Sequence, residues 1–361
     1  MKILFDSIKS FYPTLFVLIF FVSCQQRHDS KATVDAYQTL DTTEVSNLLD
    51  LNSQVALNFY PDLLYQEQSG AIIIYSKKNP LVLDPNLYIE DHFEHRDYDS
   101  IYNKPSLILS QKYKDTTEFH FSSDYSSTDS TALYFENTVV QISNYDLTKE
   151  FIPDLNSAEE WSVMANHELF HDYQRSFTEF ERIGRELSEI YNMDQILSEM
   201  YEDPIYAMLV EQENEILIRL WTDDSADLST ELIRFKNLRD QRKNYTQTKY
   251  NIPIFALEDY QVTSEGHARF FESLVKKQLA TSVQQNNPYK DYLVSKDLAL
   301  MRISNNKYWY PLGFNTAMVL EKYLPNYRMY LYKDGKNLNE CMDDLFEIVM
   351  RFDNSLVISS I

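Results

Sequence analysis

The hydrophobic pattern changes from helical to strand-like near residue 70. In residues 43–65, apolar positions recur with a spacing that predicts a helix. From residue 71 to about 143, short apolar or aromatic runs alternate with polar clusters, which is typical of strands joined by turns. The runs are residues 72–75, 81–83, 107–109, 119–121, 132–135 and 139–142, and the polar clusters include 122–124 and 126–129. This part of the chain therefore predicts a small, mostly antiparallel sheet.

After residue 157 the apolar positions follow a helical spacing as far as an amphipathic segment at 337–349. Prolines divide this part into segments at Pro153, Pro204, Pro253, Pro288 and Pro311. Strands followed by helices predict an α+β fold. We expect a β-rich region over residues 37–150 and a helical region over residues 151–361, forming one large domain or two packed lobes.

The N-terminus has the pattern of an export signal. Two lysines, Lys2 and Lys9, precede an apolar stretch at 11–22 that is too short for a confident membrane span and suits a signal peptide. The stretch ends in Phe21-Val22-Ser23-Cys24, which resembles the lipobox of bacterial lipoproteins, although Phe21 stands where leucine is usual.

This resemblance implies cleavage after residue 23, a diacylglycerol on Cys24 and a tether over residues 24–36. Gln25 follows the cysteine, and a residue other than Asp there implies sorting to the outer membrane in a cell that has two membranes. The protein is then an exported lipoprotein of the cell envelope, held to the membrane by its lipid. An ordinary signal peptide or membrane anchor with an incidental cysteine is the alternative.

The composition disfavours several kinds of bond and binding partner. The chain has two cysteines, so Cys341 has no disulfide partner if Cys24 is lipidated. A net charge of −22 disfavours nucleic acid and anionic membrane surfaces, although it also serves solubility alone. The five glycines form no glycine-rich phosphate loop.

A helix start precedes the most informative motif. Ser157 and Glu160 form the pattern of a capping box, which predicts that a helix begins there. The core face of this helix is predicted from a stripe at four-residue spacing: Trp161, Ala165, Leu169 and Tyr173.

The same helix carries His167-Glu168-Leu169-Phe170-His171. Histidines four residues apart project from one helix face, so both can bind one tetrahedral Zn²⁺. Glu168 is next to them and can take a proton from a water that the zinc activates. The motif predicts a zinc hydrolase, and incidental histidines on a surface helix are the alternative.

A zinc peptidase needs a third protein ligand. Phe177 stands where a third histidine of His-x-x-Gly-x-x-His would fall, which disfavours a metzincin. Residues 263–272, Thr-Ser-Glu-Gly-His-Ala-Arg-Phe-Phe-Glu, resemble the Glu-Gly-x-Ala-x-x-x-Glu segment of gluzincin-type metallopeptidases. The resemblance implies that Glu265 is the third ligand. Glu272, two turns further on the same face, and His267, which should face away, are the alternatives.

The resemblance carries further expectations. Thr263 or Ser264 should cap the second helix, and the small Gly266 and Ala268 should let it pack closely against the histidine helix. Gln174 resembles the glutamine of His-Glu-x-x-His-x-x-Gln variants, with an exposed surface glutamine as the alternative. The chain departs from thermolysin-like enzymes in its much longer segment between His171 and Glu265.

Two further features have weaker signals. Gluzincins commonly place a Tyr or His at the developing oxyanion, so Tyr310 or Tyr308 could act there, with core packing as the alternative. The strands at 133–135 and 139–142 immediately precede the histidine helix, where an edge strand could pair with an extended substrate. His92 and His95 have metal-ligand spacing, but their charged neighbours favour a solvated loop.

The sequence thus predicts a zinc-dependent peptidase, exported and lipid-anchored, with a peptide or protein substrate. A non-catalytic lipoprotein that binds peptide or glycan on the same scaffold is the second hypothesis. Zinc hydrolysis of a non-peptide substrate is the third. The intact Glu168 favours an enzyme, because no fold requires a glutamate at that position.

Overall fold

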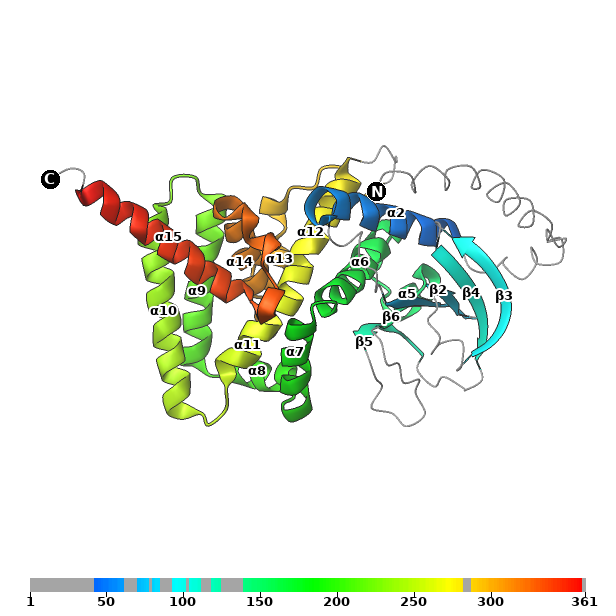
Figure 1. Cartoon of the computed structure of the whole chain (residues 1–361), viewed down its shortest axis with the longest axis horizontal. Helices are drawn as coiled ribbons and strands as arrows, with labels where there is room; N and C mark the ends of the chain where they lie inside the picture. Colours follow the sequence, from blue (N-terminus) through cyan, green and yellow to red (C-terminus); the bar gives the residue numbers. More distant parts are fainter. Residues whose placement is uncertain are drawn as a thin grey trace, which may run out of the picture. The chain divides into compact units, whose positions relative to one another are not determined.

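The strand-like part of the sequence forms a six-stranded sheet in the computed structural model (Figure 1). Between the described strands, β1 and β6 pair in parallel and the other neighbours are antiparallel. The prediction of a small, mostly antiparallel sheet is therefore confirmed, with one parallel pair that makes it mixed. The strand order is β3 (Phe93–Ile101), β4 (Lys104–Gln111), β2 (Leu81–Leu83), β1 (Ala71–Tyr75), β6 (Val139–Ser143) and β5 (Phe121–Asp124).

The structure describes residues 42–61, 70–77, 80–84, 93–101, 104–111, 118–124, 139–281 and 287–358. The predicted signal peptide, the tether, Cys24 and the strand at 132–135 lie outside these residues. Residues 42–361 belong to one compact unit.

Two segments expected to lack strands are strands. Residues 122–124, predicted as a turn, belong to β5, where Ser122 pairs with Gln141 and Ser123 with Val140. An outer strand tolerates serines, because only part of its surface is buried. The predicted solvated loop around His95 is also wrong, since His95 lies in β3 beside a register shift; His92 is outside the described residues.

Helices make up most of the described chain, and together with the sheet they fit an α+β protein. None of the described helices is long and apolar enough to cross a membrane. The helices are α2 (Thr42–Phe59), α5 (Tyr145–Phe151), α6 (Ala158–Arg175), α7 (Thr178–Ile190), α8 (Met193–Tyr201), α9 (Pro204–Thr222), α10 (Leu228–Lys249), α11 (Ile254–Gln261), the π-helix η2 (Val262–Gly266), α12 (His267–Ala280), α13 (Leu298–Met301), α14 (Trp309–Tyr323) and α15 (Leu338–Ile358), with 3-10 turns η3 (Val294–Lys296), η4 (Pro325–Met329) and η5 (Lys333–Gly335).

Two predicted helix ends are corrected. The first helix ends at Phe59 rather than near residue 65, because Pro61 lacks the N–H that would continue it and restricts the residue before it. The last helix continues past residue 349 to Ile358.

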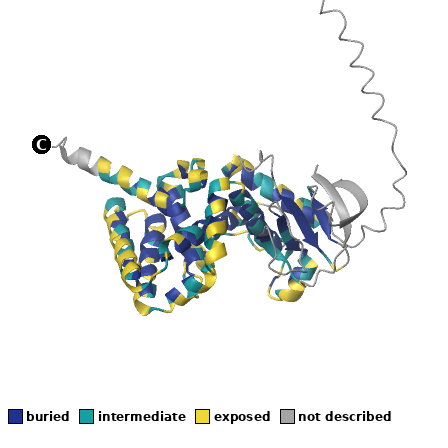
Figure 2. Ribbon diagram, turned by 60° about the horizontal axis from the view of Figure 1, so that its bottom comes forward, coloured by how far each residue is buried: buried dark blue, intermediate teal, exposed yellow. Residues whose placement is uncertain are grey.

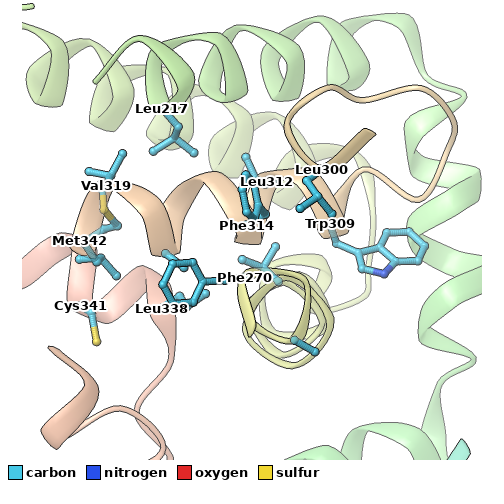
Figure 3. Packing of buried hydrophobic residues seen from close by; sticks show 14 of the residues in the cluster. Leu217, Phe270, Leu300, Trp309, Leu312, Phe314, Val319, Leu338, Cys341 and Met342 are labelled. Atoms are coloured by element: carbon cyan, nitrogen blue, oxygen red, sulfur yellow. The ribbon is translucent and has the colours of Figure 1, made fainter. Parts of the chain in front are cut away.

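Helix α14 lies at the centre of the apolar core. Its Leu312, Phe314 and Val319 are at most 2 % exposed, and each such burial is worth about 1.5–3 kcal/mol. Figure 3 shows side chains of α9, α12 and α15 packed around it, among them Leu217, Phe270, Leu338 and Met342. Cys341 lies in the same cluster, where burial raises the pKa of its thiol to about 12. Exposed positions lie on the outer faces of the helices (Figure 2).

A pair of glycines allows α14 to approach the π-helix η2. A Cβ added at Gly266 would lie 2.4 Å from Cα of Gly313, and one added at Gly313 would lie 2.1 Å from the carbonyl oxygen of Val262. Gly266 was expected to allow close packing on the histidine helix. Its close neighbour is α14 instead, although α12 does pack against α6.

A buried charge network joins α9, α10 and α11. The Arg242 guanidinium is fully buried and binds Glu213 through two nitrogens, at 2.7 Å each, and also Glu258. Burial opposes ionisation of Glu258, but Arg242 outweighs it and lowers the pKa of that carboxyl to about 2. Removing one member would leave a buried, uncompensated charge, which is strongly destabilising. The network therefore opposes displacement of any of the three helices relative to the other two.

We predict that Gly313→Ala lowers the free energy of unfolding by about 3 kcal/mol, because the new methyl group meets backbone atoms that cannot move aside. Helix propensity alone would favour alanine by about 1 kcal/mol. Urea unfolding measures the change. The control is Gly184→Ala, whose nearest neighbours are side-chain atoms of Tyr260. An equal or smaller loss at Gly313 than at Gly184 would contradict the close backbone approach.

Candidate metal centre

Helix α6 holds the histidine motif on the sheet. Ser157 accepts a hydrogen bond from Glu160 N at 3.2 Å, as the predicted cap requires, while the Glu160 carboxylate accepts from Asn156 N. Trp161 is fully buried and donates from Nε1 to the carbonyl oxygen of Ser143, at the end of β6. The predicted core stripe is confirmed: Trp161, Ala165, Leu169 and Tyr173 are all buried.

Three predicted ligands meet at one point. His167 Nε2 lies 3.0 Å from His171 Nε2 and 3.3 Å from a carboxylate oxygen of Glu265. His171 Nε2 lies 3.4 Å from the other carboxylate oxygen of Glu265. Among the described residues, these three form the group of His, Cys, Asp or Glu side chains that can hold a metal ion.

These spacings suit a tetrahedral ion. Zinc bonds of about 2.0–2.2 Å place neighbouring tetrahedral ligands about 3.4 Å apart, close to the separation of the two Nε2 atoms and to that of each Nε2 from its nearer Glu265 oxygen. The fourth position is then left for water or substrate. The Glu265 side chain is 22 % exposed, whereas those of His167 and His171 are 10 % and 7 % exposed. Solvent therefore reaches the centre beside Glu265.

Both histidines are oriented by a hydrogen bond at Nδ1, the ring nitrogen that points away from the centre. His167 Nδ1 lies 2.7 Å from a carboxylate oxygen of Glu272, and His171 Nδ1 lies 2.7 Å from Oε1 of Gln174. Each acceptor favours a proton on Nδ1, which leaves Nε2 to bind a metal. Glu272 is thus on the far side of His167, and the alternative that it is the third ligand is not supported.

Gln174 links the two ligand-bearing helices. It is 1 % exposed, so the alternative of an exposed glutamine is wrong. Its Nε2 lies 3.2 and 3.0 Å from the carbonyl oxygens of Thr263 and Ser264, and 2.7 Å from the Tyr332 hydroxyl. One amide therefore orients His171 and holds the turn before Glu265. Tyr332 has a φ of +69°, a left-handed conformation that is unusual for a tyrosine.

Glu265 lies in the π-helix η2, inside a helix that runs without a break from α11 to α12. π-helical turns are rare and often occur at functional sites. Because no helix begins at Thr263, the expectation that Thr263 or Ser264 caps one is wrong. Thr263 Oγ1 instead accepts a hydrogen bond from Leu338 N, at the start of α15.

His267 faces away from the centre, as expected. Its Nε2 lies 2.8 Å from the Tyr60 hydroxyl and 3.2 Å from that of Tyr327, and Nδ1 contacts the Tyr332 hydroxyl. Burial holds the pKa of His267 well below its usual value, so this imidazole is neutral.

The charged groups of the centre shift one another's pKa values. Burial opposes a charge on His167, yet the hydrogen bonds that its ring donates to Glu265 and Glu272 raise the pKa of that imidazole to about 10. Burial also opposes ionisation of Glu265, but the two histidines hold the pKa of its carboxyl well below the usual range. At neutral pH a metal ion must therefore displace a proton from His167 when it binds.

Glu168, Tyr310 and Tyr308, which were expected to act on substrate, differ in their exposure and in their distance from the centre. Glu168 is partly exposed and, among the described residues, has no hydrogen-bond or ion-pair partner. The ring of Tyr310 lies 6.5 Å from that of His167, and burial together with the nearby Glu265 raises the pKa of the Tyr310 hydroxyl. Tyr308 is fully buried and donates to Glu258 in the Arg242 network, so it cannot serve as an oxyanion donor.

Comparison with known proteins gives no further guide to this arrangement: no family model matches the chain, and neither a curated protein nor a solved structure matches it.

We predict that Glu265→Ala loses metal affinity far more than Glu272→Ala, because only Glu265 reaches the Nε2 atoms. Loss of the orienting Glu272 should weaken binding about 10- to 100-fold. Competitive titration of zinc against a chelator measures both variants. A larger loss in Glu272→Ala would identify Glu272 as the ligand.

Proposed function

We propose that this protein is a zinc-dependent peptidase of gluzincin type. The observation that carries the proposal is the convergence of His167 Nε2, His171 Nε2 and the Glu265 carboxylate at tetrahedral spacing, with an acceptor on each Nδ1. Two imidazoles and one carboxylate, with an open fourth position, are a donor set of catalytic zinc sites. Calcium and magnesium favour sites made only of oxygen ligands.

The surrounding residues fit hydrolysis. A zinc ion held there would lower the pKa of a bound water and polarise a carbonyl group. Glu168 would take the proton of the attacking water, which its partly exposed and unpaired carboxylate permits. Burial and the nearby Glu265 raise the pKa of Tyr310, so its hydroxyl keeps the proton and can donate a hydrogen bond to the developing oxyanion.

A peptide substrate is supported by the sheet. The strand at 139–142, predicted to pair with substrate, is β6. It lies between β1 and β5, so both of its sides are already paired and it cannot add a substrate strand. Strand β5 is the outermost described strand on that side and contacts α6. An extended peptide adding to β5 would run beside the helix that carries Glu168.

The non-catalytic alternative leaves the unpaired carboxylate of Glu168 without a role.

We predict that Glu168→Gln keeps its zinc and loses hydrolysis by about 10²–10⁴-fold, because the amide cannot accept the proton. Peptide-library cleavage measures activity, and metal analysis of the same sample shows that the site remains loaded. Chelation of the wild-type protein should abolish cleavage, and added zinc should restore it. Undiminished cleavage by Glu168→Gln would remove the general base from this proposal.

We predict that Tyr310→Phe lowers kcat about 10²-fold and changes KM little, because the lost hydrogen bond forms in the transition state. The matched control is Tyr289→Phe, a partly buried tyrosine whose ring packs against Tyr292. Equal effects of the two variants would assign Tyr310 a packing role.

A further inference from the structure

A small cavity opens beside Tyr310. It has a volume of about 180 Å³, smaller than the roughly 300–1,000 Å³ of sites for drug-sized ligands, and so suits a single side chain or chain end. It is formed by the start of α12, by α13, by the loop that leads into α14 and by the first turn of α14. Its polar and charged lining residues are Arg269, Arg302, Ser304, Asn305, Lys307 and Tyr310.

The cavity is cationic in an acidic protein. Arg269, Arg302 and Lys307 line it, and none of the described lining residues is acidic. The chain as a whole carries a net charge of −22, so a local group of three cations is a departure from the general surface. A concave site lined by one sign of charge concentrates ligands of the opposite sign. The N-terminus of α14, where Tyr308 gives no side-chain cap, adds a dipole that favours an anion.

The cavity adjoins the metal centre through two side chains. The guanidinium of Arg269 lies 4.9 Å from the Tyr310 ring centre and binds both oxygens of Glu272 at 3.0 Å. Glu272 in turn orients His167. Tyr310 lines the cavity and its ring lies 6.5 Å from that of His167, so a substrate held at the candidate metal centre would have the cavity beside it.

Two of the cations are available to a ligand. Arg302 pairs with Glu215 and Lys307 lies 3.7 Å from Asp194, but all four side chains are about half exposed. Ion pairs of this kind are weak and exchange readily in water. Arg269 uses Nη1 for Glu272, which leaves its other nitrogens for a further acceptor.

We propose that this cavity binds a carboxylate of the substrate next to the scissile bond. The carboxylate is either the C-terminus of the peptide or an Asp or Glu side chain. This inference deepens the proposed function and rests on it. Arg302 and Lys307 supply the specificity, while Arg269 also positions Glu272.

The experiment measures binding rather than turnover. Four peptide hydroxamates of one sequence, whose hydroxamate group binds zinc, are titrated into the zinc-loaded protein by calorimetry. One pair differs in a C-terminal carboxylate or amide, and the other pair, amidated at its end, in a Glu or Gln side chain. We expect one carboxylate ligand to bind about tenfold more tightly than its amide, the value of a charge-assisted hydrogen bond. The pair that shows the preference identifies the source of the carboxylate.

The test variant is Arg302→Ala/Lys307→Ala, which should bring the carboxylate and amide affinities within about twofold while the amide ligands keep theirs. Arg234→Ala/Lys236→Ala removes two exposed, ion-paired cations from α10 and should keep the preference. No preference in the wild type, no binding of any ligand, or a preference that survives in the test variant overturns the inference. A preference without peptide cleavage by the wild type would instead refute the proposed peptidase and leave the carboxylate site standing.

Discussion

The contact between α6 and the continuous helix of α11, η2 and α12 brings together His167, His171 and Glu265, three residues that can hold a metal ion and are distant in the sequence. Gln174 is the centre of this contact, because its amide accepts from His171 on one helix and donates to the Thr263 and Ser264 carbonyl groups on the other. Buried polar groups need hydrogen-bond partners. Separating the helices would leave several of these groups without a partner at once. The geometry of the three ligands is thus tied to the stability of the core.

The segment between His171 and Glu265 explains how such a contact forms across so long a stretch of chain. It consists of α7 to α11, and α9, α10 and α11 are joined through Arg242, Glu213 and Glu258. The glycine pair Gly266 and Gly313 then sets η2 against α14. The long segment is a folded support for the second half of the site.

Local rules predicted the parts of the site that depend on one helix. The four-residue spacing of His167 and His171, and the cap at Ser157, need no tertiary information. Glu265 came from a resemblance, and the sequence could not exclude Glu272, because residues seven apart share a helix face. Only tertiary packing shows that Glu265 reaches Nε2 and Glu272 reaches Nδ1. The burial of Gln174, the cap that Thr263 gives to α15 and the strand at 122–124 also depend on distant partners, which no local pattern encodes.

The π-helical turn at η2 makes the centre sensitive to chain length in an unusual way. Such a turn holds one residue more than an α-helical turn, and each residue of an α-helix advances about 100° around the axis. Deleting one residue there would restore regular hydrogen bonding yet rotate α11 against α12 by about that angle. Glu258 and Glu265 could then no longer face Arg242 and the histidines together. The extra residue acts as a phase adjustment that lets one helix serve two buried centres of charge.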